Sequence, residues 1–155
     1  MARSRPALAA CCILVTLWPA FSLAQSAVPD VVTSELFRTT GAGFLNRPGT
    51  KGVVYAMTFA VLKPSTEPRY FTVEFENPEN SAEPLKKYGT LFPSQSEFSI
   101  ESPIIKRIRN DSVYNVVVYV YSDKSKSKLL SKHIQPVQFL VPPEFIPVMG
   151  IELLE

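Results

Sequence analysis

The stretch IRNDSVYNVVVYVY, residues 108–121, decides the fold of this chain. After a polar turn it becomes a run of β-branched and aromatic residues without Gly or Pro, which predicts a strand in the middle of a sheet. Successive residues of a strand point to opposite faces. One face would carry Tyr114, Val116, Val118 and Val120, and the other Asn115, Val117, Tyr119 and Tyr121. Because both faces are largely apolar, the strand is either buried on both sides or presents one face to a partner.

The start of this stretch resembles the tyrosine corner of fibronectin type III domains and related immunoglobulin-like sandwiches. In that family a large aliphatic residue stands six positions before a Tyr, with a Pro-Gly turn between them and a Thr two positions before the Tyr. These positions are held here by Ile108, Asn110, Asp111, Ser112 and Tyr114. Asn-Asp thus replaces Pro-Gly, and the Trp usual in the first sheet is absent. The resemblance, which covers residues 108–118, implies a sandwich in which the Tyr114 hydroxyl bonds to upstream backbone, and it implies no function.

The rest of the chain carries similar patterns between Pro-rich turns. Further strands are expected at residues 52–62, 69–76, 85–92, 98–103 and 129–141. The alternation is clearest where Phe71, Val73 and Phe75 would face inward; it is weakest where Gly89 interrupts it, and Pro136 favours an edge strand or a bulge. No helical period of convincing length is present. We therefore predict an all-β chain, an antiparallel immunoglobulin-like β-sandwich of about seven strands that follows a cleaved signal peptide.

The N-terminus has the pattern of a secretory signal peptide. Arg3 and Arg5 precede an apolar run at residues 7–21, and the small residues Ser22 and Ala24 suit signal peptidase, so cleavage is expected after Ala24, with Ala27 as the alternative site. The run is short for a membrane span, and no second one follows it. The mature chain is therefore expected to be exported, to a periplasm or to the extracellular space, and to have no transmembrane segment.

Four regions follow from these patterns. They are a signal peptide at 1–24, an irregular leader with a possible edge strand at 25–49, a β-sandwich domain at 50–142 and an apolar C-terminal tail at 143–155. In the leader, residues 31–38 could form a short strand, whereas residues 39–43 are turn formers. The tail would either pack back on the domain or dock onto a partner through residues such as Phe145 and Ile146.

Removal of the signal changes the composition. It takes away Cys11 and Cys12, the two cysteines of the chain, which excludes disulfides, thiolate catalysis and cysteine metal sites from the mature protein. It also removes two of the sixteen basic residues, which leaves fourteen against fourteen acidic ones and argues against nucleic acid as a partner. The charges are unevenly distributed, with seven acidic and three basic residues at 67–101 but seven basic and two acidic at 106–132. The electric field of such a dipolar molecule can orient an approaching partner.

Few residues could carry catalysis. His133 is the one histidine, too few for a zinc site, and its position on the last strand predicts a solvated side chain and not a catalytic one. The candidate carboxylates for a glycosidase or a calcium site are Glu74, Glu76, Glu79, Glu83, Glu97 and Glu101. Their spacing is equally that of solvated faces and loops. We therefore expect no enzymatic activity, no metal and no cofactor.

The remaining class of function is recognition of a partner through the surface of the protein. The face opposite the core would carry Tyr70, Thr72, Val117, Tyr119 and Tyr121. Tyr-rich faces are favoured at interfaces, although ordinary cross-strand aromatic packing gives the same pattern. Beside this face, the loop with Lys124, Lys126 and Lys128 is either a soluble hairpin tip or a contact for an anionic glycan or lipid.

Two function classes stay open. The first is an exported non-enzymatic binding module or assembly subunit that contacts another protein, or a second copy of itself, through the Tyr-rich face or the tail. The second is an accessory or inhibitor protein that docks onto an exported enzyme or toxin through its charge asymmetry. The residues expected to contact the partner are Tyr70, Val117, Tyr119, Tyr121, Lys124, Lys126, Lys128, Phe145 and Ile146.

Overall fold

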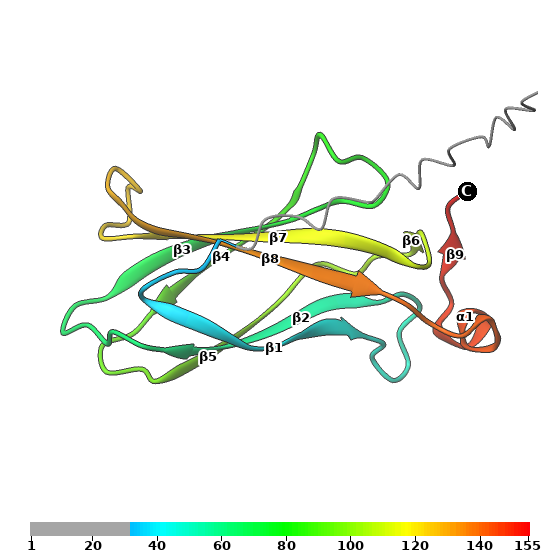
Figure 1. Cartoon of the computed structure of the whole chain (residues 1–155), viewed down its shortest axis with the longest axis horizontal. Helices are drawn as coiled ribbons and strands as arrows, with labels where there is room; N and C mark the ends of the chain where they lie inside the picture. The colour runs from blue at the N-terminus through cyan, green and yellow to red at the C-terminus, as the bar shows by residue number, and fades with distance from the viewer. Residues whose placement is uncertain (1–31) are drawn as a thin grey trace, which may run out of the picture.

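Two antiparallel sheets stack face to face in the computed structural model, which describes residues 32–155 (Figure 1). The predicted signal peptide and the cleavage after Ala24 lie outside the described residues. The first sheet has the order β1-β2-β5 and consists of β1 (Phe37–Leu45), β2 (Val54–Val61) and β5 (Glu97–Glu101). The second has the order β4-β3-β7-β8 and consists of β4 (Leu85–Leu91), β3 (Arg69–Phe75), β7 (Ser112–Tyr121) and β8 (Leu129–Phe139). The predicted antiparallel β-sandwich is therefore confirmed.

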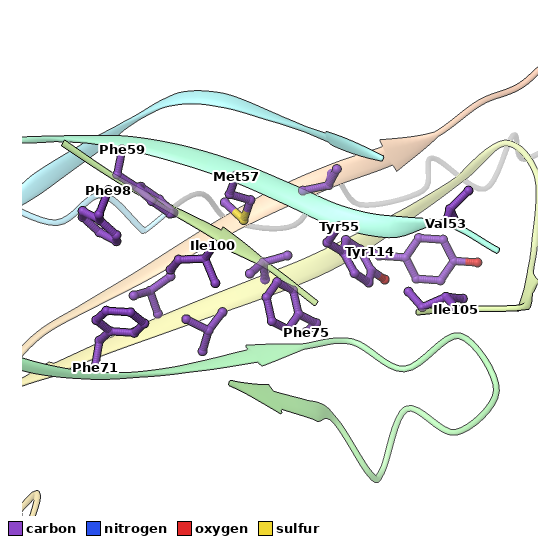
Figure 2. Packing of buried hydrophobic residues seen from close by; sticks show 14 of the residues in the cluster. Val53, Tyr55, Met57, Phe59, Phe71, Phe75, Phe98, Ile100, Ile105 and Tyr114 are labelled. Atoms are coloured by element: carbon purple, nitrogen blue, oxygen red, sulfur yellow. The ribbon is translucent and has the colours of Figure 1, made fainter. Parts of the chain in front are cut away.

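The core lies between the sheets and follows the alternation of the sequence. On β7 the inward side chains Tyr114, Val116, Val118 and Val120 are all buried. Opposite them β2 contributes Tyr55, Met57 and Phe59, which Figure 2 shows pointing toward Phe71 and Phe75 of β3. The hydrophobic burial of these strands is the main force that holds the two sheets together.

The turn before β7 has the geometry expected of a tyrosine corner. The Tyr114 hydroxyl accepts a hydrogen bond from the backbone N–H of Arg109 at 2.9 Å, five residues upstream. Ile108, in the two-residue strand β6 (Arg107–Ile108), is fully buried. Asp111 adopts a positive φ of 52°, a conformation that Asp tolerates better than most residues, so the Asn-Asp turn can replace a glycine-containing one.

The first strand lies later in the chain than the sequence predicts. The expectation of a strand at residues 31–38 and turns at 39–43 is wrong, because β1 includes Thr39, Thr40 and both glycines of that segment. The pairing of β1 with β2 shifts between Thr39 and Gly41, which is a β-bulge. A Cβ atom at Gly41 would lie 2.8 Å from the Thr58 hydroxyl oxygen, so glycine here permits the close approach of the two strands. The expected edge position is correct.

The C-terminal tail packs back on the domain. It forms η1 (Pro143–Phe145), α1 (Ile146–Met149) and β9 (Glu152–Leu153), which pairs in parallel with β6. Gly150 ends α1 with a φ of 63°, and Ile151 behind it is 6% exposed. The backbone N–H of Gly52 donates to the Met149 carbonyl at 2.8 Å. The tail therefore closes the end of the sandwich at which α1 and β9 lie in Figure 1.

His133 is buried, so the prediction of a solvated side chain is wrong. Its exposed fraction is 2%, because β8 pairs with β7 in a register that places His133 opposite the inward-facing Val118. The backbone N–H of Ser34 donates to Nδ1 at 3.2 Å, and Nε2 lies 2.9 Å from the Thr39 hydroxyl. Burial lowers the pKa of His133 below its ordinary value of 6.5. The ring is therefore neutral near pH 7, and because Nδ1 accepts a hydrogen bond, Nε2 carries the proton and donates to Thr39.

Acidification is expected to destabilise the domain through His133. In the unfolded chain the imidazole binds a proton near pH 6.5, whereas the folded chain binds it only at lower pH. Between the two pKa values the unfolded state binds more protons than the folded state, so the free energy of unfolding falls as the pH drops below 6.5. Above pH 6.5 the imidazole is neutral in both states, and the free energy of unfolding does not depend on its titration. Urea unfolding of the wild type and of His133→Asn across this range measures the effect. An equal pH dependence in both proteins would contradict it.

Candidate interaction surface

The outer face of the second sheet gathers most of the predicted contact residues. The strand register sets Tyr70 of β3 opposite Tyr121 of β7 in one row, and Thr72 opposite Tyr119 in the next. In the third row Glu74 lies opposite Val117, which in turn faces Ile134 of β8. We call this surface the tyrosine face, and it consists of Tyr70, Tyr88, Val117, Tyr119, Tyr121 and Ile134. β3, β7 and β8 are neighbours in one sheet, as the predicted common outer face of Tyr70, Val117 and Tyr119 requires.

Tyr88 of β4 belongs to the same face and was missed by the sequence reasoning. It lies in the row of Thr72 and Tyr119, and 60% of it is exposed. The sequence signal was the alternation of Lys86, Tyr88 and Thr90, which the reading of Gly89 as an interruption concealed. Glycine is needed there because a Cβ atom would lie 2.1 Å from the Phe71 ring. Gly89 therefore marks close side-chain packing inside a strand and not the end of one.

Thr72 lies under the tyrosines. Although it points to the outer face, it is 7% exposed, since it stands in one row between Tyr88 and Tyr119. Within the described part of the chain its hydroxyl has no hydrogen-bond partner. A buried hydroxyl without a partner costs free energy, so the row is not optimised for stability alone.

Lysines lie over two of the tyrosine rings. The Lys126 Nζ is 3.9 Å from the centroid of the Tyr88 ring, and the Lys132 Nζ is 5.7 Å from that of Tyr119. Both distances fall in the range of cation–π attraction. Partial burial, and next the nearby Glu74 carboxylate, raise the pKa of Tyr119, so its hydroxyl stays protonated at physiological pH.

The loop between β7 and β8 is folded around one carboxylate. Asp123 accepts hydrogen bonds from the backbone N–H groups of Ser127 and Lys128, both at 3.1 Å, and from the Ser125 and Ser127 hydroxyls. These donors, the Ser125 hydroxyl first, hold the pKa of Asp123 well below its usual range. The Asp123 carboxylate is thus occupied by hydrogen bonds from groups within the loop. Among residues 32–155, none of its three lysines forms a salt bridge.

A groove of about 300 Å³ lies where this loop meets the free edge of the sheet. It is lined by Tyr70, Phe71, Tyr88, Gly89, Thr90, Lys124 and Lys126. Its walls thus combine aromatic rings with two ammonium groups, and three of the predicted contact residues are among them. Clefts of this kind, apolar with a few polar groups, are typical of binding sites.

The two predicted contact residues of the tail lie elsewhere. Ile146 packs against the core, whereas Phe145 is exposed. Figure 1 shows α1 at one end of the sandwich and the loop between β7 and β8 at the other. The structure therefore does not bring the tail and the tyrosine face together into one surface.

Four of the six acidic residues considered for catalysis or calcium binding, Glu74, Glu76, Glu79 and Glu101, have structural partners. Glu74 pairs with Lys86 at 2.8 Å, Glu101 pairs with Arg47, and Glu76 accepts from the backbone N–H of Asn115 at 2.9 Å. Residues 32–155 contain no group of three or more His, Cys, Asp or Glu side chains placed to hold a metal ion. In the same range, no helix has the length and apolar character needed to cross a membrane.

Comparison with known proteins does not assign this chain to a family. No family model matches the sequence, and no curated protein matches it. Among solved structures, the β-glucuronidase of Bacteroides uniformis is similar to this chain with a TM-score of 0.40 and 15% sequence identity. The match covers 67% of this chain but 13% of that enzyme, and a likeness this weak carries no argument about function.

Proposed function

We propose that this protein is an exported, non-enzymatic binding module or assembly subunit that contacts another protein, or a second copy of itself, through the tyrosine face. Its architecture is an immunoglobulin-like sandwich similar to fibronectin type III domains. The strand order supports this, because β1, β2 and β5 form one sheet and β3, β7 and β8 the other, as strands A, B, E and C, F, G do in immunoglobulin folds. The hydrogen bond between Tyr114 and Arg109 supports it further.

The exposure of Tyr88 is the observation that carries the proposal. Cross-strand packing accounts for Tyr70, Tyr119 and Tyr121, which are half-buried among their neighbours. It does not account for Tyr88, since 60% of that residue is exposed to solvent even though Lys126 lies over its ring. Exposed aromatic residues with an orienting hydroxyl are enriched at protein interfaces.

An accessory or inhibitor protein for an exported enzyme or toxin is the second candidate. The lysine-rich end of the second sheet favours it, because a one-sided charge speeds association with an oppositely charged target. The two candidates differ in mass. An assembly subunit would be oligomeric by itself, whereas an accessory protein would be monomeric until its target is added.

Removal of tyrosine rings tests the tyrosine face. We expect Tyr88→Ser, and the double change Tyr119→Ser with Tyr121→Ser, to abolish self-association or partner capture while the fold is kept. Molar mass by light scattering on residues 25–155, followed by capture from the native envelope or medium, is the measurement, with circular dichroism to verify folding. Phe145→Ser removes an exposed aromatic ring at the other end of the sandwich and is the matched control. Unchanged mass and capture in the tyrosine variants, or loss of binding in Phe145→Ser alone, would overturn the proposal.

A further inference from the structure

We propose that the groove beside β4 binds an extended acidic segment of a partner polypeptide, which adds as a strand to the free edge of the second sheet. This inference rests on the proposed function and goes further, because it names the chemistry of the segment that is bound and the way in which it binds. It follows from the charge of the groove, from its floor and from the backbone of β4.

The charge around the groove is positive and lacks local compensation. Lys124 and Lys126 line it. Within residues 32–155 neither of these two forms a salt bridge, whereas Lys86 on β4 is paired with Glu74. Asp123, the nearest acidic residue in the loop, is already engaged by loop donors. Carboxylates of a partner are therefore the complementary groups.

The floor of the groove is apolar. Gly89 has no side chain, so the Phe71 ring beneath it is covered by backbone alone, while Tyr70 and Tyr88 form the aromatic walls. On a strand added to β4, successive side chains point to opposite faces. Carboxylates on the outer face can reach the Lys126 ammonium over Tyr88, and apolar side chains on the inner face can pack beside Phe71, which shares that face with Gly89. The expected segment thus alternates acidic and apolar residues.

The backbone of β4 distinguishes a polypeptide from other anions. β4 is the last strand of its sheet, and among the described residues β3 is the strand that pairs with it. Its other edge presents N–H and C=O groups at the spacing of a strand, which another extended backbone can satisfy. Neither a glycan nor a lipid headgroup has alternating donors and acceptors at this spacing.

Two ten-residue peptides, one alternating Glu and Val and the other alternating Lys and Val, test the proposal against the folded mature chain. We expect the acidic peptide to bind about tenfold more tightly than the basic one by fluorescence anisotropy. The double change Lys124→Ser, Lys126→Ser is expected to weaken this binding about tenfold, since each exposed charge pair contributes a modest amount. The double change Arg38→Ser, Lys106→Ser is the matched control, because it removes the same charge from exposed residues outside the groove and is expected to leave the affinity unchanged.

Hydrogen exchange shows whether the peptide adds as a strand. Saturating acidic peptide is expected to slow amide exchange in β4, at residues 85–91, and to leave amide exchange in β1, an edge strand of the other sheet, unchanged. Equal binding of both peptides, equal loss in both double variants, or no protection of β4 would overturn the inference. So would binding of heparin or anionic vesicles in place of the peptide, which would assign the lysines to a glycan or lipid.

The two proposals can fail separately. If Tyr88→Ser and the double tyrosine variant lose association but the acidic peptide does not bind, the tyrosine face stands and the acidic segment is wrong. If the peptide binds and protects β4 while the tyrosine variants keep their native mass and capture, the edge of β4 is the interface and the tyrosine face is not.

Discussion

Replacing Tyr55 with Ala is expected to lower the free energy of unfolding by about 3–5 kcal/mol, a large part of the stability of a domain of this size. Tyr55 of β2 is completely buried, and its ring centroid lies 4.4 Å from that of Phe44 and 5.4 Å from that of Phe75. It thereby packs against a strand of each sheet. Its hydroxyl also donates to the Glu76 carbonyl at 2.8 Å, so truncation leaves both a cavity and a carbonyl without its partner.

Tyr55→Phe separates these two effects. It keeps the ring and removes the hydroxyl alone, so we expect it to cost about 1–2 kcal/mol. Urea unfolding at neutral pH, with comparison of midpoints and slopes, gives both values. If Tyr55→Ala cost no more than Tyr55→Phe, the contact of Tyr55 with both sheets would not be important for stability.

The strands that the sequence predicts correctly are those with one clear buried face. On β2, β3 and β7 every second residue is large and apolar, and the register buries those residues between the sheets. β1 was placed too early because Gly41 and Gly43 were read as turn formers. In this edge strand Gly41 relieves crowding against Thr58 of β2 beside the bulge, and that reason is visible only in three dimensions.

His133 shows a second limit of sequence reasoning. The inward side of β8 begins with Ser131, His133 and Gln135, which looks solvated in the sequence. The polar side chains are tolerated inside because the segment before β1 supplies partners, with Ser34 donating to His133 and its hydroxyl lying 2.6 Å from that of Ser131. These contacts join residues nearly a hundred positions apart, and no local pattern reports them.

The candidate site was predicted in part. Tyr70, Val117, Tyr119 and Tyr121 share one face, as alternation along β3 and β7 required. The exposed ring of Tyr88 depended on β4, which has the weakest alternation of the sheet. The cation–π contact that Lys126 makes with that ring depends on the conformation of a seven-residue loop folded around Asp123, and spacing alone could not give it.

Deleting residues 144–155 is expected to lower the free energy of unfolding by about 3–5 kcal/mol. The deletion exposes the pocket that Ile151 fills, a side chain whose burial contributes about 1.5–3 kcal/mol. It also removes the acceptor of the Gly52 N–H and the pairing of β9 with β6, in which the Glu152 N–H donates to the Lys106 carbonyl at 2.8 Å. Each lost hydrogen bond costs about 0.5–1.5 kcal/mol.

Urea unfolding of the truncated and full-length chains measures this cost, and a truncated protein with an unchanged midpoint would contradict it. The comparison decides how the tail can be studied as an interface. Because a truncation that unfolds the domain also abolishes any assembly, loss of oligomers on deletion cannot assign a contact to the tail. The exposed residues Phe145 and Val148 can be changed to Ser at a cost within about 0.5 kcal/mol, typical of surface substitutions. An effect of these substitutions on molar mass, with the unfolding midpoint unchanged, would therefore identify the tail as a docking element, and its absence leaves the tail as a part of the core.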